Sequence, residues 1–396
     1  LWSRGLGDVY KRQHICSAIY LSRYSKFTLM FDAIKSMPAK ILLGISAFIG
    51  TLYAINFIFF SSCAVVNGDG DCFSVIPSGA ASDHESYGRG AGTLYVAGSL
   101  VLGTVMGTML ILNEGARGKW MIMLPTIAGF TCLTIVLAPP FQGGYESSSN
   151  NPVIASAIAL ICYVGAYFLL KEEGVDEGLG FKMGIGIDNE AKYAIIISSI
   201  IGTLYTINHF FFADIYAGAA EGFSLITGYE YGTYCAENVE VVSGVVCDPI
   251  AATPLSYRVL AAFFVTYVSM GLILLTHGAK GNWPVAHILL FGITFFALAV
   301  IMGNLALNEQ EIPAGDNAGE WSVDDSTSTA NIAVSALVML LNIFAYYKMR
   351  DEGVEDGMTF GGKDFGNSDD FFFKMYPAVT AVYVVLILIA NFVTQV

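Results

Sequence analysis

Nine stretches of the chain are apolar over a length that can cross a bilayer. A helix needs about 20 residues to span about 30 Å of hydrocarbon. Several of the stretches are rich in Gly, Ile, Val and Phe, which form helices poorly in water, but in hydrocarbon a lone segment must satisfy its own backbone hydrogen bonds. We therefore expect nine transmembrane helices, near residues 41–61, 91–113, 120–140, 152–171, 193–216, 257–277, 284–304, 331–349 and 375–394.

Composition agrees with a protein that lies in a membrane. Of the 396 residues, 55% are hydrophobic and 13% are charged, and the mean hydropathy is +0.61. Soluble domains carry about 25% charged residues. The fold class predicted is thus an all-α integral membrane protein. Residues 1–13 begin without Met and end in GDVYKRQ, which is typical of adapter read-through, so we expect this segment to be non-native and leave it out of the fold.

Three phrases occur twice in the chain. GTLYAIN at 50–56 returns as GTLYTIN at 202–208, GARGKW at 115–120 as GAKGNW at 278–283, and KEEGVDEGLGF at 171–181 as RDEGVEDGMTF at 350–360. Self-similarity of this kind predicts two tandem units of four helices each, which an even number of spans makes parallel in the membrane.

These phrases set the predicted organisation of the chain. We expect an N-terminal segment at 14–40, a first unit at 41–181, a second unit at 182–360, and a linker with the ninth helix at 361–396. Asn391 stands in the ninth helix where Asn56 and Asn208 stand in the first helix of each unit. The ninth helix therefore resembles the start of a third unit.

Basic residues gather on one side of the predicted membrane layout. Fourteen Lys and Arg residues fall in the segments that share the side of 14–40, whereas only Arg89 and Arg258 fall on the other side. Such a bias predicts that the first side is cytoplasmic. The chain is acidic overall, with a formal charge of −14, but acidic residues contribute little to orientation.

Cysteines support the same orientation. Two pairs fall in the equivalent non-cytoplasmic loops of the two units, Cys63 with Cys72 and Cys235 with Cys247. Paired cysteines on that face are typical of disulfides formed in an oxidising compartment. Cys132 and Cys162 fall inside predicted helices, where we expect them to be packing residues.

The repeated GTLY phrase places small, aromatic and amide side chains on one side of a helix. Helical periodicity groups Gly50, Tyr53 and Asn56 on the first helix, and it groups Gly202, Tyr205, Asn208 and His209 on the fifth. One interpretation is a packing face, in which the glycine allows close approach and the amide bonds to a neighbouring helix. The other is a polar path or solute site. Because His209 stands where the first unit has Phe57, it is not part of the shared pattern.

The repeated acidic motif follows the fourth helix of each unit. Lys171 and Arg350 suit the negative end of a helix, and the glycines after them suit a helix stop. A helix stop does not require the acids and the aromatic that recur, so the motif is either a turn packed against the next helix or a docking edge for a basic cytoplasmic partner. The recurring residues are Asp176, Glu177 and Phe181 in the first unit and Glu355, Asp356 and Phe360 in the second.

No catalytic motif, cofactor site or metal-ligand pattern is present in the sequence, which favours a non-enzyme, and an acidic membrane chain is a poor binder of nucleic acid. The first hypothesis is a structural or organising protein that acts through lateral contacts in the bilayer, with a second copy or another membrane protein, and through its loops. The alternative is a channel or facilitator for a small solute, with the repeated Tyr and Asn positions along its path.

Overall fold

The computed structural model describes residues 33–60, 87–139, 151–180, 187–217, 220–228, 252–307, 325–360, 363–364 and 371–394. Helices dominate this part of the chain, and the sheet within it pairs two strands of two residues each. The elements are α2 (Met37–Phe59), α4 (Tyr87–Glu114), α5 (Trp120–Leu137), α6 (Asn151–Leu169), the 3₁₀ turn η3 (Lys171–Glu173), α7 (Asn189–Phe211), α8 (Ala213–Tyr216), α9 (Ala252–His277), α10 (Trp283–Leu307), α11 (Asp325–Arg350), β1 (Thr359–Phe360), β2 (Lys363–Asp364) and α12 (Phe371–Thr394).

The described helices confirm an all-α polytopic membrane protein of about nine helices. Eight of them are long and apolar enough to cross a membrane, and α12 holds a shorter apolar stretch, Met375–Ala390. One predicted helix is too long: the segment expected at 193–216 breaks at Phe212, where α7 ends and the short α8 begins. The break coincides with an ion pair between Asp214 of α8 and Arg258 of α9, at 2.5 Å.

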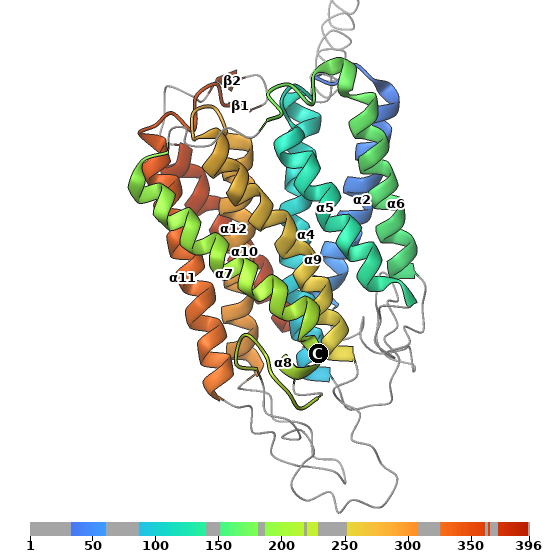
Figure 1. The fold of residues 1–396 in the computed structure, drawn as a ribbon, viewed down its shortest axis with the longest axis vertical. Helices are drawn as coiled ribbons and strands as arrows, with labels where there is room; N and C mark the ends of the chain where they lie inside the picture. Colours follow the sequence, from blue (N-terminus) through green and yellow to red (C-terminus); the bar gives the residue numbers. More distant parts are fainter. Residues whose placement is uncertain are drawn as a thin grey trace, which may run out of the picture.

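The eight long helices run side by side along the bundle in Figure 1, and their mutual contacts close into a ring. Its neighbours in order are α4, α2, α6, α5, α9, α7, α11 and α10, and α10 packs back against α4; α4 and α9 also touch across the middle. We refer to α2, α4, α5 and α6 as the first set and to α7, α9, α10 and α11 as the second set. Each set forms half of the ring, and the halves meet at two seams, α4 with α10 and α5 with α9.

Small residues bring the helices together at both seams. A side-chain carbon added to Gly103 of α4 would lie 3.0 Å from the Cα atom of Gly292 on α10. One added to Gly129 of α5 would lie 3.2 Å from the carbonyl oxygen of Ala262 on α9 and against the Thr266 side chain. The offset of 163 residues between the GARGKW and GAKGNW phrases pairs Gly103 with Thr266 and Gly129 with Gly292. The repeat therefore pairs each of these residues of one seam with a residue of the other seam. The division of the chain into two repeated units remains a prediction.

Helix α12 lies outside the ring, against α10 and α2. Its Tyr376 hydroxyl lies 3.0 Å from the hydroxyl of Thr294 on α10. Its Tyr383 ring stacks on Phe295 of α10 with 4.1 Å between centroids, and the Tyr383 hydroxyl is hydrogen-bonded to Ser99 of α4. α12 therefore ties together the two helices of one seam.

Large apolar side chains cover the outside of the ring. Phe48 on α2, Ile161 on α6 and Phe211 on α7 are 65%, 68% and 75% exposed. In water such a surface would be unfavourable, whereas hydrocarbon is its natural solvent. The outer helices thus face a lipid bilayer, as expected from the sequence.

The ends of the bundle differ in how the helices are connected. One end, here named the turn end, carries short turns at 115–119, 170–180, 278–282 and 351–358, together with β1 and β2. The other, here named the loop end, carries α8.

Some predicted residues lie outside the described part of the chain. These are the segment 1–13, Phe181 and the four loop cysteines Cys63, Cys72, Cys235 and Cys247. Phe360 lies in β1 and Asn391 in α12. Cys132 is half-buried and Cys162 is buried, and both are unpaired.

Candidate functional site

Both glycines of the repeated phrase lie where two helices pack closely. A side-chain carbon on Gly50 of α2 would lie 2.7 Å from a methyl group of Val105 on α4, and one on Gly202 of α7 would lie 2.8 Å from a methyl group of Val268 on α9. Val105 and Val268 are also separated by 163 residues. The glycines thus serve the same contact in the two sets, and Gly202 in addition borders a cavity.

The repeated asparagines are fully buried near the loop end. The Asn208 Oδ1 atom accepts hydrogen bonds from the Ser224 hydroxyl at 2.8 Å and from the Ile226 backbone N–H at 3.2 Å. Asn56 is likewise engaged in an interaction. Asn208 therefore fastens the segment after α8 to the end of α7 and does not line the cavity.

The repeated tyrosines contact the residue one turn later on their own helices. Tyr53 meets Phe57 edge to face at 5.6 Å, and Tyr205 meets His209 in the same way at 5.5 Å. His209 is 2% exposed and also packs against Tyr216 of α8 at 4.7 Å. The second set thus places an imidazole where the first set has a phenyl ring.

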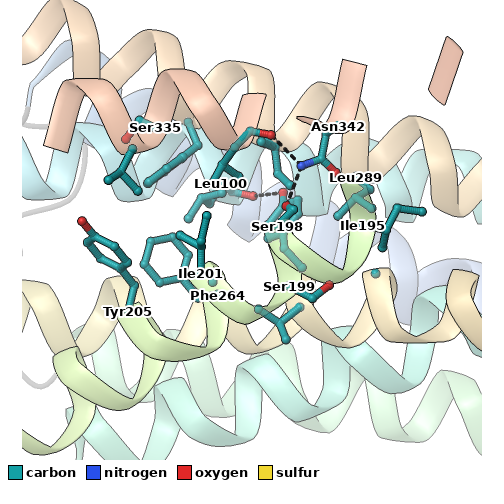
Figure 2. Close-up of a pocket in the computed structure, with 18 residues that line it drawn as sticks. Leu100, Ile195, Ser198, Ser199, Ile201, Tyr205, Phe264, Leu289, Ser335 and Asn342 are labelled. Carbon is teal, nitrogen blue, oxygen red and sulfur yellow. Dashed lines mark hydrogen bonds between the residues drawn. The ribbon is translucent and has the colours of Figure 1, made fainter. Parts of the chain in front are cut away.

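A partly open cavity of about 70 Å³ lies between α7, α9, α10 and α11 of the second set, with Leu100 of α4 in its wall. Most of the lining is apolar. Its polar members come mainly from α7 and α11, and Figure 2 shows Ser335 and Asn342 of α11 with Ser198, Ser199 and Tyr205 of α7. This cavity is the strongest candidate for a functional site.

Asn342 is the central polar group of the cavity. Its amide nitrogen donates to the Ser198 hydroxyl at 2.7 Å and to the Val338 carbonyl at 2.8 Å. Both N–H bonds are therefore used, whereas no donor to Oδ1 is found among the described residues. The cavity thus offers a free amide oxygen as an acceptor and the Ser198 hydroxyl hydrogen as a donor.

Side-chain size explains why this space exists in the second set. In the first set, the buried Tyr163 of α6 is hydrogen-bonded to Thr108 of α4 and lies 5.6 Å from Phe130 of α5. The repeat offsets pair Tyr163 with Asn342 and Thr108 with Gly271, and both partners border the cavity. Tyrosine and threonine fill the interior of the first set, whereas asparagine and glycine leave room in the second.

A chain of three titratable side chains lies between the cavity and the turn end. His287 Nε2 of α10 lies 2.6 Å from the Tyr346 hydroxyl of α11. That hydroxyl donates to Glu355 Oε1 in the following turn, at 2.8 Å. His287 is 6% exposed, so it needs such partners in an apolar interior.

The acids of the repeated motif bond within the chain. Asp176 lies 4.0 Å from Lys171, and Glu355 lies 4.0 Å from Arg350 at the paired position. Glu177 lies 2.5 Å from Arg117. The Asp356 carboxylate lies beside the backbone of Gly353 in the same turn. These contacts fit a turn packed on its own bundle better than an edge left open for a basic partner.

The two turns also join the helices of each set. Gly118 N–H donates to the Gly174 carbonyl, and Gly281 N–H donates to the Gly353 carbonyl, both at 2.9 Å. Gly174 and Gly353 have φ values of 78° and 80°, a left-handed conformation that suits glycine. The motif glycines are therefore structural.

Several residues with structural or cavity-lining roles lie outside the predicted sites. Glu173 accepts hydrogen bonds from the backbone N–H groups of Lys35 and Ser36, at 2.8 and 2.6 Å, and so connects the end of α6 to the start of α2. Asn342 and Ser335 lie outside the repeated phrases. The available signal was their spacing on α11, which puts them on the same side as Asn331 and Tyr346.

Metal sites and comparisons with known proteins provide no further indication of function. Within the described residues, no three His, Cys, Asp or Glu side chains gather to hold a metal ion. No protein-family model, curated protein or solved structure matches this chain. The case for function therefore depends on the geometry of the cavity.

Proposed function

We propose that this chain is an integral membrane protein whose second set of helices binds a small uncharged solute within the bilayer and facilitates its passage. The observation that carries the proposal is the cavity at Asn342 and Gly271, where the paired residues of the first set fill the interior. Of the two functions expected from the sequence, the geometry favours the facilitator for the second set.

The lining of the cavity defines the class of solute. Asn342 Oδ1 requires a donor, and the Ser198 hydroxyl offers one hydrogen to an acceptor. A hydroxyl or a primary amide supplies both. The apolar walls, which include Ile195, Leu289 and Phe264, disfavour an ion because none of the lining side chains carries a charge that would offset its lost hydration.

The volume of the cavity limits the solute to a few non-hydrogen atoms. It is about half that of an engineered cavity of about 150 Å³ that binds benzene. A short alcohol, a small diol or a small amide matches both this size and the hydrogen-bonding pattern. Water is also small enough to enter, so the test below includes it.

We assign the structural role predicted from the sequence to the first set. Its interior is filled by Tyr163 and Thr108, and its two seams with the second set support a bracing role. In this proposal the two sets are related tandem units of tetraspan form, with no catalytic role. Lateral contacts with a second copy or another membrane protein would use the apolar outer faces.

We also propose that the turn end faces the cytoplasm. The bias of Lys and Arg toward the segments at this end supports that orientation. The loop cysteines would then lie on the non-cytoplasmic side, where disulfides form.

A liposome assay tests the proposed function. The purified chain is reconstituted, and stopped-flow light scattering measures entry of water, methanol, ethylene glycol, urea, acetamide and glycerol. We expect at least one organic solute to enter faster than in empty liposomes. Asn342→Tyr, which introduces the residue of the first set, should reduce that entry to the empty-liposome rate.

The matched control is Ser46→Ala in the first set, at the position paired with Ser198. It should leave solute entry unchanged, because Ser46 lies in the filled set. Absence of any solute entry above the empty-liposome rate would refute the proposal, as would full entry in a folded Asn342→Tyr variant.

A further inference from the structure

Aromatic side chains lie between the cavity and the loop end. Tyr205 and Ser335 stand at one end of the cavity in Figure 2, away from Asn342. The Tyr205 ring meets His209 one turn later, at 5.5 Å between centroids, and His209 in turn packs on Tyr216 at 4.7 Å. Tyr216 belongs to α8, which lies at the loop end (Figure 1). The three rings therefore connect this end of the cavity to α8.

These rings are tightly enclosed. His209 and Tyr216 are 2% and 1% exposed. His209 also packs against two rings of α9, with 4.9 Å to Tyr257 and 6.1 Å to Phe264 between centroids, and Phe264 lines the cavity. A solute that moves from the cavity toward the loop end must therefore displace at least one of these rings.

Two tyrosine hydroxyls meet on one amide oxygen of α11. Tyr216 donates to Asn331 Oδ1 at 2.9 Å, and Tyr205 donates to the same atom at 3.4 Å. Asn331 precedes the cavity-lining Ser335 by one helical turn. The Tyr216 hydroxyl thus fastens α8 to the helix that forms one wall of the cavity. We refer to this hydrogen bond between Tyr216 and Asn331 as the latch.

A second contact holds α8 to α9. Asp214 of α8 lies 2.5 Å from Arg258, whose side chain is 14% exposed. The apolar residues of α8 pack with Tyr257 in a small cluster that is separate from the main core. Small packing units with few buried apolar contacts open locally at a lower free energy than the core. α8 can therefore move while the ring of long helices stays intact.

The backbone leaves the helical conformation just before α8. Phe212, between α7 and α8, has a φ of −124° and a ψ of 23°, which lies outside the α-helical region. Hinges are typically a few residues at the end of an element that absorb such changes. On the other side of α8, Ser224 and the Ile226 N–H hold the segment 220–228 to Asn208. Movement is therefore limited to α8, between Phe212 and this anchored segment.

The first set has different residues at the described positions that correspond to these contacts. The offset of 179 pairs Asn331 with Pro152, which has no side-chain hydrogen-bonding group. The offset of 163 pairs Arg258 with Tyr95, which has no charge to form an ion pair. The contacts that hold α8 and the cavity beneath it therefore occur in the same set of helices.

We propose that α8 is a lid at the loop end of the cavity, and that opening of the latch limits the rate at which solute passes. This inference rests on the proposed function. Opening breaks the hydrogen bond to Asn331 and the ion pair of Asp214, and it withdraws the Tyr216 ring from His209. Solute then reaches the loop end past Tyr205, and closure restores these contacts behind it.

Solute entry into liposomes tests the lid. Tyr216→Phe keeps the ring and removes the hydroxyl of the latch, and Asp214→Asn removes the charge that pairs with Arg258. Each variant should raise entry of the fastest solute by about threefold or more, because one interhelical hydrogen bond in a membrane shifts an equilibrium by about this factor. The control is Tyr163→Phe, which removes a hydrogen-bonded tyrosine hydroxyl from the first set and should leave entry unchanged. Unchanged or slower entry in either folded lid variant would overturn the inference and leave the proposed function in place.

A second measurement does not require solute entry. Ser335→Cys places a thiol in the cavity beneath the lid, and a small water-soluble methanethiosulfonate reagent labels it in nanodiscs, with mass spectrometry of its peptide as the readout. We expect labelling to be about threefold faster or more when Tyr216→Phe is added. Ser156→Cys, at the paired position in the first set, is the control and should react at one rate in both backgrounds. Equal labelling of Ser335→Cys with and without Tyr216→Phe would refute the lid even if no solute crosses.

Discussion

Asn342 of α11 donates a hydrogen bond to Ser198 of α7, at 2.7 Å, across the wall of the cavity. The position paired with Ser198 in the first set is Ser46, whose buried hydroxyl has no hydrogen-bond partner among the described residues. The position paired with Asn342 is Tyr163, which bonds instead to Thr108. One set therefore uses its buried serine in a polar contact, and the other does not.

This difference predicts opposite effects of two matched substitutions. Asn342→Leu should lower the free energy of unfolding by about 1 kcal/mol, because interhelical hydrogen bonds in membranes contribute about 0.6–1.7 kcal/mol. Ser46→Ala should be neutral or slightly stabilising, because it removes a buried hydroxyl without a partner. Unfolding in mixed micelles with increasing SDS measures both. Equal losses of stability for the two variants would contradict the account.

The seams predict a strong effect of added volume at Gly292. Gly292→Val should destabilise the ring by about 2 kcal/mol or more, because overpacking typically costs 1–3 kcal/mol and a side-chain carbon there would overlap the Tyr267 ring. Gly44→Val on α2 is the control, since no atom outside the immediate chain lies within 4 Å of its added carbon. Thermal unfolding of the two variants in detergent makes the comparison, and equal melting temperatures would show that the seam is not tightly packed.

The helices could be predicted from the sequence because a long apolar segment in hydrocarbon must satisfy its own backbone hydrogen bonds, and a helix does so. The predicted packing positions Gly50 and Gly202 lie in equivalent helix contacts. The cavity was not predictable from the repeated phrases, because only Gly202 and Tyr205 of its lining belong to them. It depends on Asn342 being smaller than Tyr163, which matters only once α6 and α11 are known to face the interior of their sets. The order of helices around the ring likewise depends on contacts between segments far apart in the chain.

The role of Glu173 was missed for a related reason. Its partners are backbone N–H groups at the start of α2, more than 130 residues earlier in the chain, and backbone groups leave no mark in a residue pattern. The recurring acids were visible in the sequence because they repeat, and the structure places Asp176 near Lys171 of the same turn and Glu177 beside Arg117 of the neighbouring turn.

The hydrogen bonds that Glu173 accepts from the start of α2 should make its carboxylate important for stability. Glu173→Ala should lower the free energy of unfolding by about 1–2 kcal/mol, in the range of helix caps and of hydrogen bonds to charged groups. The exposed neighbour Glu172 provides the control, and Glu172→Ala should change little. Hydrogen exchange at the start of α2 gives a local readout: it should become faster in Glu173→Ala alone. Unchanged exchange there would mean that the cap is dispensable.

The raised pKa of Glu352 in the folded state should make the stability of the protein depend on pH. Burial raises the pKa of Glu352 above its ordinary value of 4.5, and the charge of Asp188 adds to the effect, while a hydrogen bond from the Asp188 backbone N–H opposes it. A raised pKa in the folded state means that the contribution to stability is present below pH 4.5 and is lost as the pH rises through the folded value. Glu352→Gln should therefore be more stable than wild type at pH 7, and the advantage should shrink toward pH 4.5. Melting temperatures across this range test the sign, with exposed Asp351→Asn as the control.

The central claim is that the second set holds a solute and the first does not. Its most direct test is equilibrium binding of the radiolabelled solute that enters liposomes fastest, measured on purified protein with wild type beside the paired variant Gly271→Thr/Asn342→Tyr. We predict saturable binding of one molecule per chain in wild type and none in the folded variant. Saturable binding of the same stoichiometry and affinity in both proteins would contradict the claim.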